Sequence, residues 1–126
     1  YVWKTEPAGN NAVNAILIAP DQWYELAVDG MERLETYEIN GLTDWRVFTE
    51  AEAREFTQEF KDTNLETLNN LLNKNEMNEM QHDAGERYLC ADGTKTFSFS
   101  NNRILDTGKT QEYYLRPVKT ICIKLK

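Results

Sequence analysis

The first half of the chain predicts one buried strand followed by a helix. From Ala12 to Ala19 both alternating sets of residues are largely apolar, which is typical of a strand covered on both faces. Apolar residues then recur at helical spacing from Trp23 to Tyr37, and Asp21 can accept backbone N–H bonds at the start of such a helix. We therefore expect a helix from Asp21 to Tyr37. Tyr1 to Asn11 should be an extended lead-in and turn.

Two capping boxes indicate further helices. Thr49 stands three residues before Glu52, and Thr63 stands three residues before Glu66. In this pattern the threonine side chain and the glutamate side chain each satisfy a backbone N–H of the first turn. Phenylalanines and leucines follow both boxes at helical spacing, so we expect one helix after each threonine. Asn40-Gly41 is a strong turn signal.

The period changes to two in the last third of the chain. The polar segment Asn73 to Gly85 predicts a long loop with helical fragments. Beyond it, alternation around Phe97 to Ser100 and Thr120 to Leu125 predicts a meander of antiparallel strands. We infer one α+β domain over residues 1–126, with helices in the first half and most strands in the second.

Charge and hydropathy restrict the possible partners. The 126 residues include 21 acidic and 14 basic side chains, and the net charge of -7 would repel nucleic acid phosphates. No apolar run approaches the ~20 residues that span a bilayer, so we expect no transmembrane segment. Because the chain begins at Tyr1 rather than Met, we expect that a signal peptide, a lipoprotein leader or an upstream domain has been removed.

The sequence contains no pattern that predicts catalysis. His82 is the single histidine, and it has neither a paired histidine nor another metal-ligand spacing around it. Cys122 alternates with isoleucines in a strand pattern, and it either pairs with Cys90 or remains a free thiol. The chain has no phosphate-binding loop, nucleophile elbow or dinucleotide-binding motif. We expect no catalytic residues, no cofactor and no metal.

Three segments carry a family resemblance. Trp23 to Ala27 and Gly41 to Glu52 resemble the signature of the Lcl C-terminal domain family, with Asp44-Trp45-Arg46 as the most specific part. Tyr113 to Val118 is similar to that family's closing strand, although Pro117 stands where a cysteine is common.

The resemblance implies a C-type lectin-like fold, in which the terminal strands pair and two helices pack beside a twisted sheet. It also implies an extracytoplasmic setting at a bacterial surface or envelope, and a role in adhesion or ligand binding. The triplets of calcium-dependent sugar-binding lectins are missing, so we do not expect calcium-dependent sugar binding. We interpret Trp45 as a core residue and Arg46 as a partner of backbone carbonyls or of a carboxylate.

We therefore expect a non-enzymatic binding module whose partner is a surface protein or glycan. A structural or assembly domain of a larger surface or pilus-like protein is the alternative. Binding should use the polar loops around Asn73 to Gly85 and Asn101 to Arg103, because core positions occupy the helices and strands. Alternation sends one of two neighbouring tyrosines outward. The candidate ligand-binding residues are Asn101, Asn102, Arg103, Lys109, Tyr113 and Tyr114.

Overall fold

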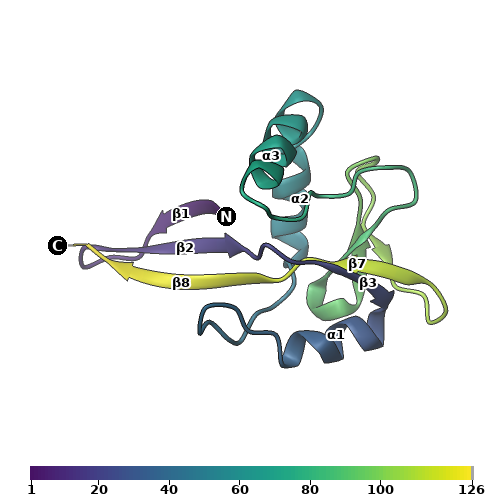
Figure 1. The fold of residues 1–126 in the computed structure, drawn as a ribbon, viewed down its shortest axis with the longest axis horizontal. Helices are drawn as coiled ribbons and strands as arrows, with labels where there is room; N and C mark the ends of the chain where they lie inside the picture. The colour runs from purple at the N-terminus through teal and green to yellow at the C-terminus, as the bar shows by residue number, and fades with distance from the viewer. Residues whose placement is uncertain (126) are drawn as a thin grey trace.

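The computed structural model describes residues 1–125, which form an α+β fold with two sheets (Figure 1). The first sheet has the order β1-β2-β8, and the second has the order β3-β7-β4-β5-β6. The strands are β1 (Val2–Pro7), β2 (Ala12–Ile18), β3 (Trp23–Leu26), β4 (Tyr88–Cys90), β5 (Lys95–Phe97), β6 (Leu105–Asp106), β7 (Glu112–Leu115) and β8 (Val118–Lys124). The helices are α1 (Ala27–Glu35), α2 (Glu50–Glu59), α3 (Thr63–Lys74) and the short 3-10 helix η1 (Ala91–Gly93).

The first sheet joins the two ends of the chain. Strands β2 and β8 are antiparallel, with Ala12 opposite Lys124 at one end and Ile18 opposite Val118 at the other. The predicted strand at Ala12 to Ala19 and its pairing with the C-terminal strand are confirmed. Strand β1 pairs with the other side of β2, so the expected lead-in is extended but also belongs to the sheet.

The segment after β2 differs from the prediction. Trp23–Leu26 is a strand, β3, and the helix begins only at Ala27. Strand β3 pairs in antiparallel register with β7, where Trp23 lies opposite Leu115. The helical spacing of the apolar residues was a misleading signal, because a partner strand some ninety positions along the chain decides the backbone conformation here.

The two predicted capping boxes have different outcomes. At α2 the box is complete: the Glu52 N–H donates to Thr49 Oγ1 over 3.1 Å, and the Thr49 N–H donates to Glu52 Oε1 over 2.9 Å. At α3 the predicted box is wrong, because Thr63 is already helical and Asp62 occupies the cap position without a side-chain hydrogen bond. The turn from α2 to α3 is tight, and Asp62 adopts a positive φ of 52° within it.

The C-terminal third is not a simple meander. Strands β4, β5 and β6 are antiparallel neighbours, but β7 runs parallel to β4, and β8 leaves for the other sheet. The expected loop begins slightly later than predicted, since α3 continues to Lys74. Buried Asn69 fixes that loop, since its Oδ1 accepts from the Met80 N–H and its Nδ2 donates to the Met80 carbonyl.

Trp45 and Arg46 have the structural roles predicted for them. The Trp45 ring is buried in a core cluster, and its Nε1 donates to the Leu42 carbonyl over 3.0 Å. The Arg46 guanidinium donates to both carboxylate oxygens of Glu52, over 2.6 and 3.0 Å, and to the Val47 carbonyl.

Within residues 1–125, none of the helices is long and apolar enough to cross a bilayer.

Candidate functional site

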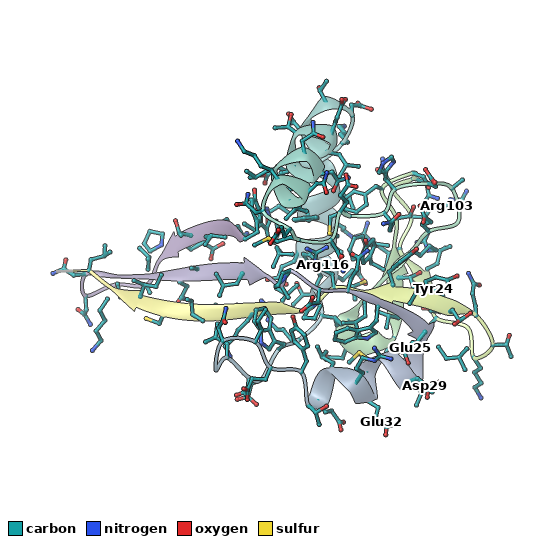
Figure 2. All side chains as sticks on the ribbon, viewed as in Figure 1. Tyr24, Glu25, Asp29, Glu32, Arg103 and Arg116 are labelled. Carbon is teal, nitrogen blue, oxygen red and sulfur yellow. The ribbon has the colours of Figure 1, made fainter. Side chains whose placement is uncertain are left out.

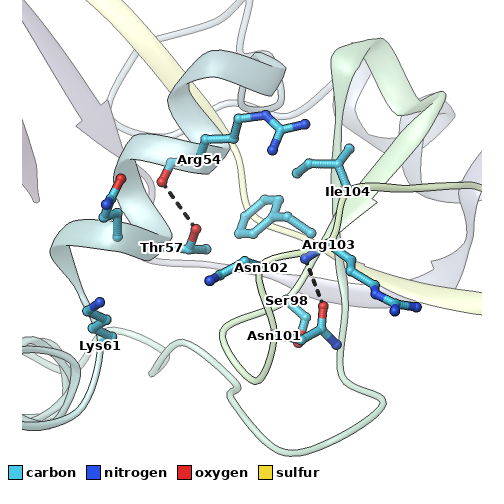
Figure 3. A pocket seen from close by; sticks show the side chains of 10 residues that line it. Arg54, Thr57, Lys61, Ser98, Asn101, Asn102, Arg103 and Ile104 are labelled. Atoms are coloured by element: carbon cyan, nitrogen blue, oxygen red, sulfur yellow. Dashed lines mark hydrogen bonds between the residues drawn. The ribbon is translucent and has the colours of Figure 1, made fainter.

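A polar pocket lies between helix α2 and the loop that connects β5 to β6 (Figure 3). Its volume is about 230 Å³. Pockets for drug-sized ligands usually measure about 300–1,000 Å³. This pocket therefore fits one residue or one end group of a larger ligand. The lining residues are Arg54, Thr57, Gln58, Lys61, Phe97, Ser98, Asn101, Asn102, Arg103 and Ile104.

The helix side of the pocket follows from helical periodicity. Arg54, Thr57 and Gln58 are spaced three and one residues apart, so they share one face at the C-terminal end of α2. Lys61 follows two residues after this helix ends. The opposite stripe of the same helix, which includes Phe56, is buried in the core. Packing of that stripe holds the polar face at a fixed position.

A buried arginine holds the loop side from beneath. Arg87 Nη2 donates to the Arg103 carbonyl over 2.6 Å and to the Thr96 carbonyl over 3.0 Å, while its Nε donates to Thr96 Oγ1. At the tip of the loop the Arg103 N–H donates to Asn101 Oδ1 over 3.0 Å, which forms an Asx turn. These hydrogen bonds fix the conformation of the loop at its end and at its tip.

Positive charge distinguishes this pocket from the rest of the molecule. Its lining includes Arg54, Lys61 and Arg103 and no acidic residue, although the chain has a net charge of -7. Arg54 Nη2 lies 3.2 Å from Glu50 Oε2 in an exposed pair, which leaves most of its charge to solvent. Among residues 1–125, no carboxylate lies within 4.0 Å of the side-chain nitrogens of Lys61 or Arg103.

The side chains do not all point the same way. Figure 3 shows the Asn102 amide reaching toward α2, and the Arg54 guanidinium extending across to Ile104. The Arg103 guanidinium points away from the helix, on the outer side of the loop. Arg54 and Asn102 are therefore the labelled residues best placed to contact a group inside the pocket, and Lys61 lies at its edge, beyond the end of α2.

The structure separates the predicted site residues. Asn101, Asn102 and Arg103 line the pocket, whereas Lys109 is exposed in the turn before β7 and is not part of the lining. Tyr113 is buried, with 4% exposure, and its hydroxyl oxygen accepts from the Gly108 N–H over 2.7 Å. Its role is therefore to support a turn.

Tyr114 is the outward member of the pair, but other aromatic rings cover half of it. Its ring centroid lies 4.7 Å from that of Tyr24 and 5.3 Å from that of Tyr88. Its hydroxyl donates to Glu86 Oε2 over 3.3 Å. It lines a shallow depression that shares none of the residues lining the polar pocket.

Sequence reasoning missed the helix side of the pocket. A polar helix face is usually solvated. The spacing of Arg54, Thr57 and Gln58 identifies such a face, but nothing local indicates that the β5–β6 loop lies across from it. Only the tertiary arrangement brings the two segments together.

The other reactive side chains lie apart from this pocket. Cys90 is a buried free thiol, and burial raises its pKa to about 11. Cys122 is an exposed free thiol on β8, so the two cysteines do not pair. His82 is exposed in the loop after α3. In the part of the chain that the structure describes, no three histidine, cysteine or carboxylate side chains gather as a metal-binding group.

A second buried arginine lies at the centre of the molecule (Figure 2). Arg116 is 1% exposed, and no carboxylate pairs with it among residues 1–125. Its Nε donates to the Ala19 carbonyl over 2.6 Å, and its Nη1 donates to the Asn78 carbonyl over 2.7 Å and to Gln22 Oε1 over 3.0 Å. Burial lowers its pKa to about 10.

Comparisons with known proteins add no further constraint. No protein-family model matches the chain, and searches of curated proteins and of solved structures found no match either.

Proposed function

We propose that this chain is a non-catalytic binding module that takes up an acidic sugar residue of a surface glycan in the pocket between α2 and the β5–β6 loop. The observation that carries the proposal is the charge of the lining, which includes three basic side chains and no acidic one in a chain of net charge -7. A carboxylate or sulfate would form charge-assisted hydrogen bonds with Arg54 and Lys61.

The remaining lining favours a sugar ring over an acidic peptide. The amides of Gln58 and Asn102 offer donors and acceptors in several directions. The Thr57 hydroxyl donates to the Ala53 carbonyl and offers an acceptor. These match a ring that carries hydroxyl groups as well as one acidic group. Phe97 supplies apolar surface in the same pocket, and sugar rings also have apolar faces. The volume of about 230 Å³ suits one residue of a chain rather than a whole oligosaccharide.

A binding role without catalysis is supported by the placement of the reactive groups. The high pKa of Cys90, caused by burial, keeps its thiol protonated at neutral pH, and the thiolate is the nucleophilic form. The side chain of His82 is in the loop after α3 and does not line the pocket. We propose a C-type lectin-like fold and an extracytoplasmic location as well. Pairing of β2 with β8 supports the fold, and the resemblance at Gly41 to Glu52 supports both.

The test is a glycan array that presents sulfated and carboxylated sugars beside their neutral counterparts, with acidic peptides as a third set. We expect selective binding of acidic glycans that weakens as salt rises, because exposed charge interactions are screened. Equal binding of the neutral counterparts would overturn the proposal. Preference for the acidic peptides would reassign the pocket to a protein partner.

Matched variants connect the array result to the pocket. Arg54→Gln with Lys61→Gln should weaken binding by about tenfold or more, since each change removes a charged donor. Lys109→Gln is the control, because it removes one charge from an exposed turn outside the pocket. Its effect should stay below about twofold. Equal losses in both variants would indicate that net charge alone attracts the glycan.

A further inference from the structure

The two free edges of the first sheet differ in their protection. The edge formed by β1 carries Pro7, a register shift between Val2 and Lys4, and the charged side chains of Lys4 and Glu6. Proline, bulges and charge are the features that prevent an edge strand from pairing with another chain. Strand β8 has neither a proline nor a bulge: its seven residues contain no proline and pair with β2 in unbroken register.

The backbone of β8 presents a row of unpaired groups along this edge. At this edge the backbone of Val118 pairs with that of Arg46. The Val118 N–H donates to the Arg46 carbonyl over 2.7 Å, and the Val118 carbonyl accepts from the Arg46 N–H over 2.8 Å. Alternate residues of a strand direct their N–H and C=O groups to the same side. Thr120, Cys122 and Lys124 therefore face outward, and none of the backbone hydrogen bonds of residues 1–125 reaches these groups.

One face of the same strand carries apolar side chains, which are covered near Ala15 and exposed toward Leu125. In Figure 1 the sheet of β1, β2 and β8 extends to the left beyond all the helices. Register places Ile121 opposite Ala15 and Ile123 opposite Val13, so these four side chains share one face. Ile123 is 42% exposed and Leu125 is 53% exposed. An edge that is long, regular and apolar is the kind that pairs with another strand.

We propose that β8 is a dimerisation edge, which pairs antiparallel with β8 of a second copy of this chain to form a continuous six-stranded sheet. The backbone of Arg46 occupies the edge at Val118, and the Arg46 guanidinium donates to Thr120 Oγ1 over 2.8 Å. Intermolecular pairing must therefore begin at the backbone groups of Thr120. A two-fold axis at Cys122 uses all three outward residues, because Thr120 then faces Lys124 of the second copy and Cys122 faces its counterpart.

Side-chain complementarity supports this register. With the axis at Cys122, Ile121 of each copy lies directly opposite Ile123 of the other, so apolar side chains of the two copies come into contact. Directly opposed apolar pairs stabilise a sheet, whereas directly opposed like charges destabilise it. Lys124 faces Thr120 and Lys119 faces Leu125, so neither lysine faces a lysine. An axis at Lys124 would instead place the two Lys124 side chains opposite each other.

A self-complementary edge is what a two-fold dimer requires, and this favours a second copy over an unrelated partner. The inference concerns a different surface from the ligand pocket and goes beyond the binding role proposed above. It would also give the chain the assembly role that the sequence left as an alternative.

Sedimentation velocity of the complete chain between about 10 μM and 1 mM tests the proposal, because a single strand pair without a large packed interface gives weak association. Cys122→Pro removes the central outward N–H, which has no backbone partner among residues 1–125, and should abolish dimers. Cys122→Ser keeps that N–H at the same position and should dimerise as the wild type does. Thermal melting of both variants verifies that they fold.

A second matched pair tests the apolar face without altering the backbone. Ile123→Lys should weaken the dimer by about tenfold or more, because a charge replaces an apolar contact. Val2→Lys alters a residue of similar exposure on the β1 edge and should have no effect. A short bismaleimide should also join the two Cys122 thiols, whose strands would lie about 5 Å apart.

A wild type that stays monomeric at 1 mM would overturn the proposal. That result would not bear on the proposed ligand binding, which the glycan array tests separately. A dimer that survives both Cys122→Pro and Ile123→Lys would overturn it too, because another surface would then be responsible.

Discussion

Arg46 and Arg116 each contact a segment that is distant in sequence, but they do so by different chemistry. Arg46 is part of an ion pair at the surface, with its side chain 32% exposed and both Glu52 oxygens within 3.0 Å. Arg116 is fully enclosed and donates to two backbone carbonyls and an amide oxygen. Its Nη2 has no hydrogen-bond partner within residues 1–125.

The difference teaches how this fold accommodates a buried charge. Carbonyl oxygens carry partial negative charge, so they offset only part of the cost of removing a guanidinium from water. The lowered pKa of Arg116 expresses the remaining cost. In return the side chain connects the end of β2 to the loop after α3, which no continuous backbone pairing joins. The surface ion pair of Arg46 loses less hydration on folding and has a smaller effect on stability.

Removal of the buried arginine should have the largest effect. We expect Arg116→Ala to lower the free energy of unfolding by about 4 kcal/mol, because it leaves a cavity and buried carbonyls at Ala19 and Asn78 without donors. Urea denaturation measures the change. Arg116→Met, which fills the volume without the charge, separates the two causes. If both variants were as stable as the wild type, Arg116 would contribute no net stability.

Removal of the surface arginine should cost less. Arg46→Ala should lower the free energy of unfolding by about 1–1.5 kcal/mol, since charge-assisted hydrogen bonds contribute more than neutral ones but partial exposure weakens them. The same denaturation assay measures it. A loss as large as that of Arg116→Ala would contradict the contrast between the two arginines.

The surface pair should also depend on pH. Burial alone would raise the pKa of Glu52, but hydrogen bonds from Arg46 and from the Thr49 backbone outweigh burial and bring the pKa below its ordinary value of 4.5. A lowered pKa in the folded state means that the carboxylate stabilises the protein above its ordinary pKa and loses this effect as the pH falls.

Glu52→Gln should therefore lower the free energy of unfolding by about 1 kcal/mol at pH 7, and the two proteins should converge below about pH 4. Urea denaturation at several pH values checks this. A difference that stays constant from pH 7 to pH 3 would mean that the charge of Glu52 is not responsible.

The smallest effect is the coupling between Arg46 and Thr49, which share the Glu52 carboxylate. In a double-mutant cycle of Arg46→Ala and Thr49→Ala, we expect a coupling free energy of about 0.5 kcal/mol, because groups in one hydrogen-bond network are not additive. Additive losses would indicate that the capping box holds Glu52 in place without the arginine.

Local signals predicted the elements of this fold that depend on local chemistry. The apolar segment at Ala12 to Ala19 and the alternation near the C-terminus became β2 and β8, and the box at Thr49 became the start of α2. Strand β3 was mistaken for helix because its conformation depends on β7, a distant partner. The box at Thr63 failed because the helix already includes Thr63, and Asp62 takes the cap position with a positive φ of 52° and without a side-chain hydrogen bond.

The candidate site follows the same division. Asn101, Asn102 and Arg103 could be predicted because polar turn residues identify a loop from the sequence alone. Their partners on α2 could not, since a polar helix face has the same sequence pattern whether it faces water or a pocket. Lys109 and Tyr113 were near in sequence but are separated from the pocket by the course of the β6–β7 turn.

The pairing of β2 with β8 has a consequence for the order of folding. Residues 12 and 124 are direct neighbours in this sheet, so its closure joins segments more than one hundred positions apart. Contacts between residues so far apart in sequence form slowly, because the conformational entropy of the intervening loop is lost before the contacts stabilise the sheet. During synthesis β2 must remain without this partner until almost all of these residues have left the ribosome. The apolar strand is then exposed to chaperones, and β1 is the one neighbour already available to cover it.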